Sequence, residues 1–243
     1  MGKSSKSEVK DRRAVVEEMR REQQRAEKKR TYTIVAACVV VGLVIIGLGA
    51  YPLIKQNMVA SGDLETLGAG TDQAGCQEIV TESAEGTNDH REIGTDIVYQ
   101  DAPPAFGPHY NQTAGFQRKY YSTGDRPDIE YLVHNLEHGY NVLWYDETVA
   151  DNGDDLAVVK AIAEKFEGAD PTDKFIAVPW TEEDGNAFPD GAHVALTHWY
   201  ADPADPANGQ EGVWQYCDAP SGEVVRQFVE DYPFSDSPEP GAI

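Results

Sequence analysis

The feature that most constrains this chain is an uncharged run of 22 residues, Thr33–Ile54. An α-helix rises 1.5 Å per residue, so a helix of this length crosses the hydrocarbon core of a bilayer with some tilt. Tyr32 and Tyr51 lie near the ends of the run, where aromatic rings favour the membrane–water interface. The run therefore predicts a transmembrane helix rather than a buried helix of a soluble domain.

A cleaved signal peptide explains this run less well than an anchor does. About 30 residues precede the run, whereas the charged region of a signal peptide is short. The segment Val35–Cys38 is similar to a lipoprotein cleavage box, but most of the apolar run follows Cys38, where a lipoprotein would already be mature. We therefore expect an uncleaved signal anchor that spans residues 33–54.

Charge is distributed unevenly on the two sides of the run. Residues 1–30 carry 11 Lys/Arg and 6 Asp/Glu, a net charge of +5, whereas residues 31–243 carry 9 and 36, a net charge of −27. Because positively charged flanks stay inside, we expect a cytoplasmic basic tail at 1–30 and an acidic part outside the plasma membrane. The expected partner of this single-pass protein is the lipid bilayer, and its acidic outer part should repel nucleic acid.

The sequence after the anchor predicts one folded domain between two loose segments. Residues 55–75 are rich in Gly, Ala, Thr and Asp, which is typical of a linker, and residues 233–243 are rich in Pro and Ser, which predicts a flexible tail. Residues 76–232 between them are numerous enough for a single core. The residue patterns predict strands at 97–99, 140–145, 175–179 and 194–200, and helices at 156–166 and 221–232. Because these elements do not alternate regularly, the expected fold class is α+β: one N-terminal transmembrane helix followed by a single compact extracytoplasmic α+β domain.

The cysteines agree with an oxidising compartment. Cys38 lies within the predicted span, and the outer part contains only Cys76 and Cys217. Two such cysteines most simply form one disulfide, which would tie the start of the domain to its end. The alternative is that their thiolates bind a metal ion, which requires reducing conditions or a soft ion such as Cu(I).

A mostly apolar stretch, residues 131–145, contains two histidines and a glutamate. His134 and His138 are roughly 13 Å apart on a strand but share one face of a helical turn. Gly139 suits the end of such a turn, so we expect a helical turn, a glycine and then a strand. Burying the two imidazoles with Glu137 is costly unless a partner satisfies them. Either they bind a metal ion, or the two histidines bond to backbone carbonyls in the core.

Three motifs give the chain a family resemblance. Gly107–His109, Val133–Gly139 and Ala195–Trp199 resemble the actinobacterial-type family catalogued as domain of unknown function 3105 (DUF3105). Members of that family share this layout of a short basic tail, one membrane anchor and one extracytoplasmic domain. The resemblance implies a small residue before the tryptophan, where this chain has His198. This extra histidine either adds a metal ligand or is a surface group.

The leading functional hypothesis is a metal-binding domain. His109, on a proline-stiffened loop, would meet His134 and His138 on the helical turn, and Glu137 would orient a ligand beside them. Three imidazoles suit Zn or Cu, with water or a fourth protein ligand completing the site.

Two other classes of function stay open. The pattern His134-x-x-Glu137-His138 matches the H-x-x-E-H motif of zinc metallopeptidases, in which Glu137 would be the catalytic general base and Glu223 a possible downstream ligand. The small domain argues against catalysis. The other class is a non-catalytic accessory subunit of a cell-envelope membrane complex, anchored by its single helix.

Overall fold

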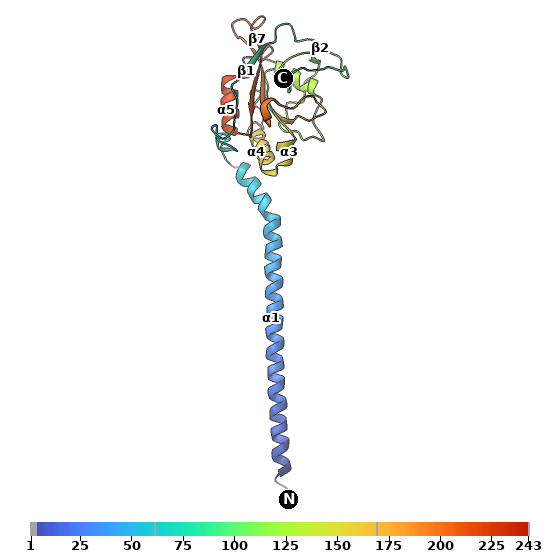
Figure 1. Cartoon of the computed structure of the whole chain (residues 1–243), viewed down its shortest axis with the longest axis vertical. Coiled ribbons are helices and arrows are strands. Elements are labelled where there is room, and N and C mark those ends of the chain that lie inside the picture. Colours follow the sequence, from blue (N-terminus) through green and yellow to red (C-terminus); the bar gives the residue numbers. More distant parts are fainter. Residues whose placement is uncertain (1–3, 61, 169, 243) are drawn as a thin grey trace. The chain divides into compact units, whose positions relative to one another are not determined.

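The computed structural model describes residues 4–60, 62–168 and 170–242, and the chain divides into two compact units, Met1–Lys55 and Gln56–Ile243. Helix α1 (Ser4–Ala60) contains the whole uncharged run (Figure 1). By length and composition its stretch Val16–Gly47 is able to cross a membrane, and none of its most apolar part is buried within the protein. The side chains of residues 48–49 and 51–54, the end of the predicted span, lie outside the described residues.

The second unit is built on a five-stranded mixed sheet with the strand order β1-β7-β6-β4-β5. Its strands are β1 (Val80–Ser83), β4 (Asn141–Tyr145), β5 (Phe175–Pro179), β6 (Val194–Ala201) and β7 (Gln210–Cys217). Strands β4 and β5 are parallel, and the other neighbours are antiparallel. Two short strands, β2 (His90–Arg91) and β3 (His109–Tyr110), form a separate parallel pair. This mixed sheet with helices that do not alternate regularly with its strands confirms the expected α+β class.

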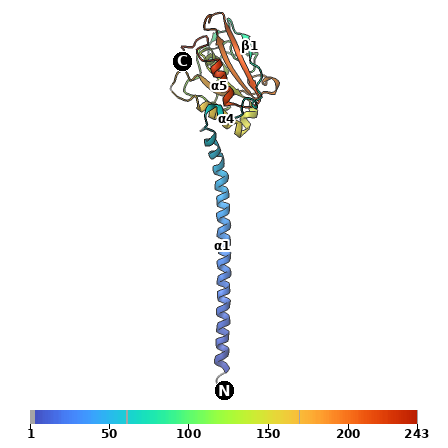
Figure 2. The same cartoon turned by 90° about the vertical axis from the view of Figure 1, so that its left-hand side faces the viewer.

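Helices cover both faces of the sheet. They are α2 (Ile129–Glu137), α3 (Glu147–Asp151), α4 (Gly153–Glu164) and α5 (Gly222–Asp231), with the 3-10 turns η1 (Leu64–Thr66) and η2 (Pro189–Gly191). Because neighbouring side chains on a strand point to opposite faces, Val142 and Trp144 pack in one apolar cluster with Leu136 of α2, whereas Leu143 packs in another with Val225 of α5. Figure 1 shows α5 and β2 on opposite sides of the sheet, and Figure 2 shows α5 across its near face.

Most of the predicted elements are present near their predicted bounds. The helical turn is α2, Gly139 follows it with φ +91°, and β4 comes next. The predictions at 156–166, 175–179, 194–200 and 221–232 correspond to α4, β5, β6 and α5, the last capped by the Ser221 side chain. The strand predicted at 97–99 is wrong: this segment pairs with no other strand, and Tyr99 instead donates a hydrogen bond to Pro108 O.

The segment expected to be a linker packs onto the domain from residue 64 onward. Leu67 and Ala74 are buried in the apolar cluster beneath α5. Gly68 has φ +74°, and a Cβ atom there would lie 2.3 Å from Pro220 O. The glycines of residues 55–75 therefore permit close backbone packing here, which composition alone does not distinguish from flexibility.

The C-terminal tail is likewise bound to the domain. The buried Lys174 ammonium donates hydrogen bonds to Pro240 O (2.9 Å) and Ala242 O (2.8 Å), and Ser237 is buried. A buried ammonium group needs acceptors, and the tail backbone provides them. Residues 233–242, expected to be flexible, therefore form a fixed segment that we name the C-terminal strap.

His198 has neither of the roles that the sequence suggested, because it is fully buried on β6 and bonds to backbone. Its Nδ1 lies 3.3 Å from Tyr140 O and its Nε2 lies 3.1 Å from Asp236 O of the strap. Burial lowers the pKa of this imidazole to about 4, outweighing the two carbonyls and the charge of Asp236, which raise it. Burial therefore favours the neutral form of His198 near neutral pH, in which the ring donates to one of these two carbonyls.

Cys76 and Cys217 form the disulfide that the sequence predicted. The bond joins the segment before β1 to the last residue of β7, across a sequence separation of 141 residues. Beside it, Ala74 O accepts hydrogen bonds from Asp218 N and Ala219 N. With both sulfurs in this bond, neither cysteine is available as a thiolate ligand.

Replacing Cys76 and Cys217 together by Ser should lower the free energy of unfolding by about 4–5 kcal/mol, because the loop of the denatured chain is then no longer closed. Denaturant unfolding of the purified protein measures this change, with Cys38→Ser as the control that removes only the free cysteine. A loss below about 1 kcal/mol would contradict a structural role for the bond.

The His198 imidazole should make folding stability fall as the solution is acidified. Its pKa is about 4 in the folded protein and 6.5 ordinarily, so between these pH values the unfolded chain binds a proton that the folded chain does not. Above pH 6.5 the ring is neutral in both states and costs no stability. As the pH falls to 4, the free energy of unfolding decreases by about 3 kcal/mol. His198→Ala should flatten the dependence of unfolding free energy on pH in this window, and identical slopes in the two proteins would refute the assignment.

Candidate metal centre

Helix α2 supplies three side chains of the site from one face. His134, Glu137 and His138 occupy positions i, i+3 and i+4, which are neighbours on a helix surface. The two histidine Nε2 atoms are 3.0 Å apart, and His134 Nε2 is 3.9 Å from Glu137 Oε2. The helix is held in place by its apolar face and by Asn135, whose amide exchanges two hydrogen bonds with the backbone of Ala114.

The fourth predicted residue, His109, reaches the same place from β3. Its ring is fully buried, and its Nε2 lies 3.0 Å from Glu137 Oε2. Its Nδ1 lies 2.8 Å from Gly107 O. Gly107 has φ +127°, a conformation that residues with a side chain rarely adopt, so the Gly-Pro-His motif gives the turn that aims this ring.

Backbone carbonyls fix which ring nitrogen faces the site. A carbonyl oxygen only accepts, so the Nδ1 atoms facing Gly107 O and Tyr110 O, the latter 2.6 Å from His134 Nδ1, must carry the protons. In the neutral rings this leaves lone pairs on Nε2 of His109 and His134, both directed toward Glu137. Metal-binding histidines are held in the same way in known sites.

His90 belongs to the site but was not expected from the sequence. Strand β2 runs parallel to β3 with His90 paired to His109, and the ring centroids of the two histidines are 4.6 Å apart. His90 Nε2 lies 3.5 Å from Glu137 Oε2, and its side chain is 41% exposed. Only the pairing of two two-residue strands brings it here, and strands so short leave no periodic signal in a sequence.

The donor atoms fall into two groups that share Glu137. Those of His90, His109, His134 and Glu137 all lie within 4.8 Å of one another, and so do those of Glu137, His138 and Glu239. The structure therefore places three of the four expected residues in the first group and His138 in the second. Glu239, in the strap, lies with its Oε2 3.5 Å from His138 Nε2.

The ionisation states at neutral pH suit a cation. Burial lowers the pKa of His134, as does the nearby His109, and burial followed by the charge of His134 lowers that of His138 to about 4. Burial alone would raise the pKa of Glu137, but contact with His109 and the charges of the surrounding histidines bring it below its ordinary value. Metals bind neutral imidazole and ionised carboxylate, and burial favours the neutral form of His134 and His138.

Several buried atoms at this site make no hydrogen bond within the described residues. They are His109 Nε2, both carboxylate oxygens of Glu137, and His138 Nδ1. The 3.0 Å contact of His109 with Glu137 is close but is not aligned as a hydrogen bond. Ligands bound about 2.0–2.1 Å from one tetrahedral ion lie about 3.3 Å apart. The separations from Glu137 Oε2 to the Nε2 atoms of His109, His90 and His134 are 3.0, 3.5 and 3.9 Å, which bracket that value.

Glu223, considered as a downstream ligand, lies elsewhere. It is on α5, against the opposite face of the sheet, where its carboxylate accepts a hydrogen bond from Thr71 N. Glu223 is therefore too far from His134 and His138 to complete a peptidase-type zinc site with them.

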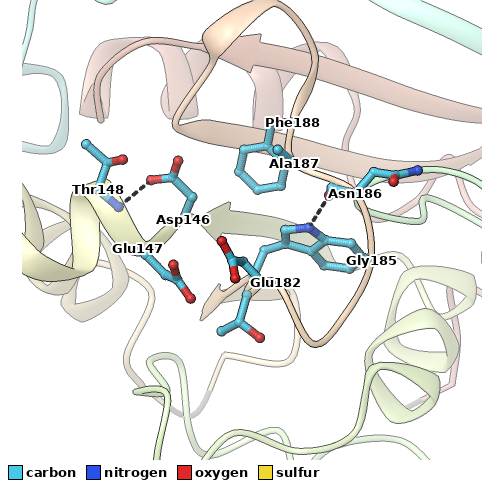
Figure 3. Close-up of a pocket in the computed structure, with 10 residues that line it drawn as sticks. Asp146, Glu147, Thr148, Glu182, Gly185, Asn186, Ala187 and Phe188 are labelled. Atoms are coloured by element: carbon cyan, nitrogen blue, oxygen red, sulfur yellow. Dashed lines mark hydrogen bonds between the residues drawn. The ribbon is translucent and has the colours of Figure 1, made fainter.

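A separate pocket of about 190 Å³ lies beside α3 and is drawn in Figure 3. Two of its polar side chains have structural partners. Asp146 accepts from Thr148 N and contacts His193 Nδ1 at 2.8 Å. Trp180 Nε1 donates to Asn186 O. Among the described residues, the converging groups of three or more candidate metal donors do not include any residue of this pocket.

Comparison with known proteins agrees with the motifs. The chain matches the family described as "Protein of unknown function (DUF3105)" over residues 90–243, a region that begins at His90 and includes every donor described above. No curated protein sequence and no solved structure matches the chain. Since the match covers well over half of its length, the chain belongs to the DUF3105 family.

Proposed function

We propose that the domain binds a transition-metal ion, Zn or Cu, through His90, His109, His134 and Glu137. The observation that carries the proposal is the convergence of these four donors within 4.8 Å around buried atoms that have no hydrogen-bond partner. A buried carboxylate in such surroundings is costly unless a cation compensates it.

The ligand set favours a divalent ion of borderline softness. Imidazole suits zinc and copper, and the single carboxylate adds a harder ligand. Soft Cu(I) is served best by thiolates, but Cys76 and Cys217 are joined in a disulfide. Zn(II) and Cu(II) are therefore the ions to test first.

The surroundings of Glu137 support binding rather than peptide hydrolysis. A general base must reach a water molecule, whereas this carboxylate is fully buried among three histidines. Glu223 is not available as a third ligand. No contact among the described residues specifically favours docking on a larger envelope complex.

We further propose that α1 anchors the protein in the plasma membrane with the metal-binding domain outside. The apolar stretch of α1, the basic residues before it, and the disulfide of the domain support this orientation. The metal would then be acquired outside the cytoplasm.

Glu137→Gln should abolish tight metal binding while keeping the shape of the side chain. Because loss of groups that only orient ligands weakens affinity about 10–100-fold, loss of this ligand should weaken Zn(II) binding by more than about 100-fold. Competition with a chromophoric chelator measures the affinity. The metal-free variant should unfold at the same or a higher temperature than the metal-free native protein, since a buried charge is removed.

Matched variants separate a ligand effect from a general one. His109→Ala should also lose tight binding, whereas His193→Ala removes a histidine that pairs with Asp146 outside the site and should bind normally. Zn(II) at 100 times its Kd should stabilise the native protein by about 2.7 kcal/mol and leave the Glu137→Gln protein unchanged. Equal affinities in the native, Glu137→Gln and His109→Ala proteins would refute the site.

A membrane-impermeant amine reagent added to intact cells should label the folded domain and leave the N-terminal basic tail unlabelled. Lys165 is an exposed lysine of the domain, and Lys28 and Lys29 are exposed lysines of the tail. Mass spectrometry of the labelled peptides reads the result, and permeabilised cells show that all three lysines can react. Labelling of Lys28 or Lys29 with Lys165 protected would reverse the orientation.

A further inference from the structure

Glu137 faces two groups of donors, and one ion does not satisfy both. Its Oε2 atom lies 3.0–3.9 Å from the Nε2 atoms of His90, His109 and His134. Its Oε1 atom is also buried, with no hydrogen-bond partner among the described residues. If Glu137 bound an ion through Oε2 alone, its Oε1 atom would remain buried without a cation or a hydrogen-bond donor.

His138 would also lose its partner when an ion binds the first group. Its Nε2 lies 3.0 Å from His134 Nε2, which bears a lone pair because His134 Nδ1 donates to Tyr110 O. Without an ion, His138 can donate its Nε2 proton to that lone pair. Once that lone pair is bound to an ion it no longer accepts, so this 3.0 Å contact would no longer be a hydrogen bond.

The strap holds a further carboxylate beside His138. Glu239 N donates a hydrogen bond to Glu137 O (3.0 Å), and Glu239 Oε2 lies 3.5 Å from His138 Nε2. Gly139 allows this approach, because a Cβ atom there would lie 2.4 Å from Phe234 O of the strap. Glu239 is therefore placed by fixed backbone contacts.

We propose that a second divalent cation binds between Glu137, His138 and Glu239, with the Glu137 carboxylate bridging the two ions. This inference rests on the proposed function, because the first ion creates the need for the second. With three protein ligands, and with the Glu239 side chain 50% exposed, the second ion keeps coordination positions open to water. The centre would be dinuclear, with a closed first site and an open second site.

The alternative is a single ion with His138 and Glu239 as a hydrogen-bonded pair beside it. In that case Glu137 Oε1 stays unpaired, and replacing Glu239 leaves the number of bound ions unchanged. The two arrangements therefore differ in stoichiometry and in the magnetic coupling between ions.

Titration of the full-length protein with Co(II) distinguishes them. The untagged protein is purified in detergent, stripped with a chelator, and titrated while visible absorption and electron paramagnetic resonance spectra are recorded. We expect two Co(II) per native chain, with a resonance signal that grows to one equivalent and declines toward two as the bridged ions couple. Glu239→Gln, a change at a half-exposed side chain, should bind one Co(II) and weaken the second step at least 10-fold.

Further variants make each outcome decisive. His138→Gln should also bind one ion, whereas Glu137→Gln should bind neither tightly. Glu223→Gln, which alters a carboxylate on the opposite face of the sheet, should bind two. One ion in both the native and Glu239→Gln proteins would overturn the second site and leave the first intact, while no ion in the native protein would overturn both. Two ions without coupling, or two in both Glu239→Gln and His138→Gln, would overturn the bridged arrangement.

Discussion

The structure of this site depends on one buried carboxylate. Glu137 is fully buried, ionised by its surroundings, and without an aligned hydrogen bond to either oxygen among the described residues. Such a charge is compensated in folded proteins by a cation or by donors, and the groups closest to this carboxylate are the Nε2 atoms of three histidines. Three features place donors around this carboxylate. They are the apolar cluster around α2, the turn before His109 and the β2–β3 pair. The cation proposed for this site would compensate the carboxylate and bind the imidazoles together.

Sequence patterns predicted the parts of the site that lie on regular structure. The four-residue spacing of His134 and His138 inside an apolar stretch required a helical turn, and Gly139 marked its end. His109 was predicted because the family resemblance rests on the motif Gly107–His109 together with the helix motif Val133–Gly139. His90 could not be found in this way, because its position depends on a two-residue strand pairing that leaves no periodic pattern.

Composition misjudged the edges of the domain for a shared physical reason. Segments rich in Gly or Pro are predicted to be flexible because their side chains bury little area. The backbone of such segments can nevertheless pack closely against a domain. Gly68 brings residues 64–75 against α5, and the strap carbonyls satisfy the buried ammonium of Lys174. The candidate donor Glu239 was missed for the same reason, since a residue in a tail that is expected to be flexible is not considered as a donor.

The proposed ligands come from separate parts of the chain, so binding of the proposed ion would be linked to folding. His90, His109, α2 and the strap meet only in the folded domain, so an unfolded chain has no preformed site, and the free energy of binding adds to that of folding. The disulfide does not compete with this process, because the site contains no sulfur ligand. An oxidising compartment can therefore close the Cys76–Cys217 bond and still leave every imidazole and carboxylate able to bind a metal ion. Since neutral imidazoles remain ligands where thiols are oxidised, histidine and glutamate are the residue types suited to a metal centre outside the cytoplasm.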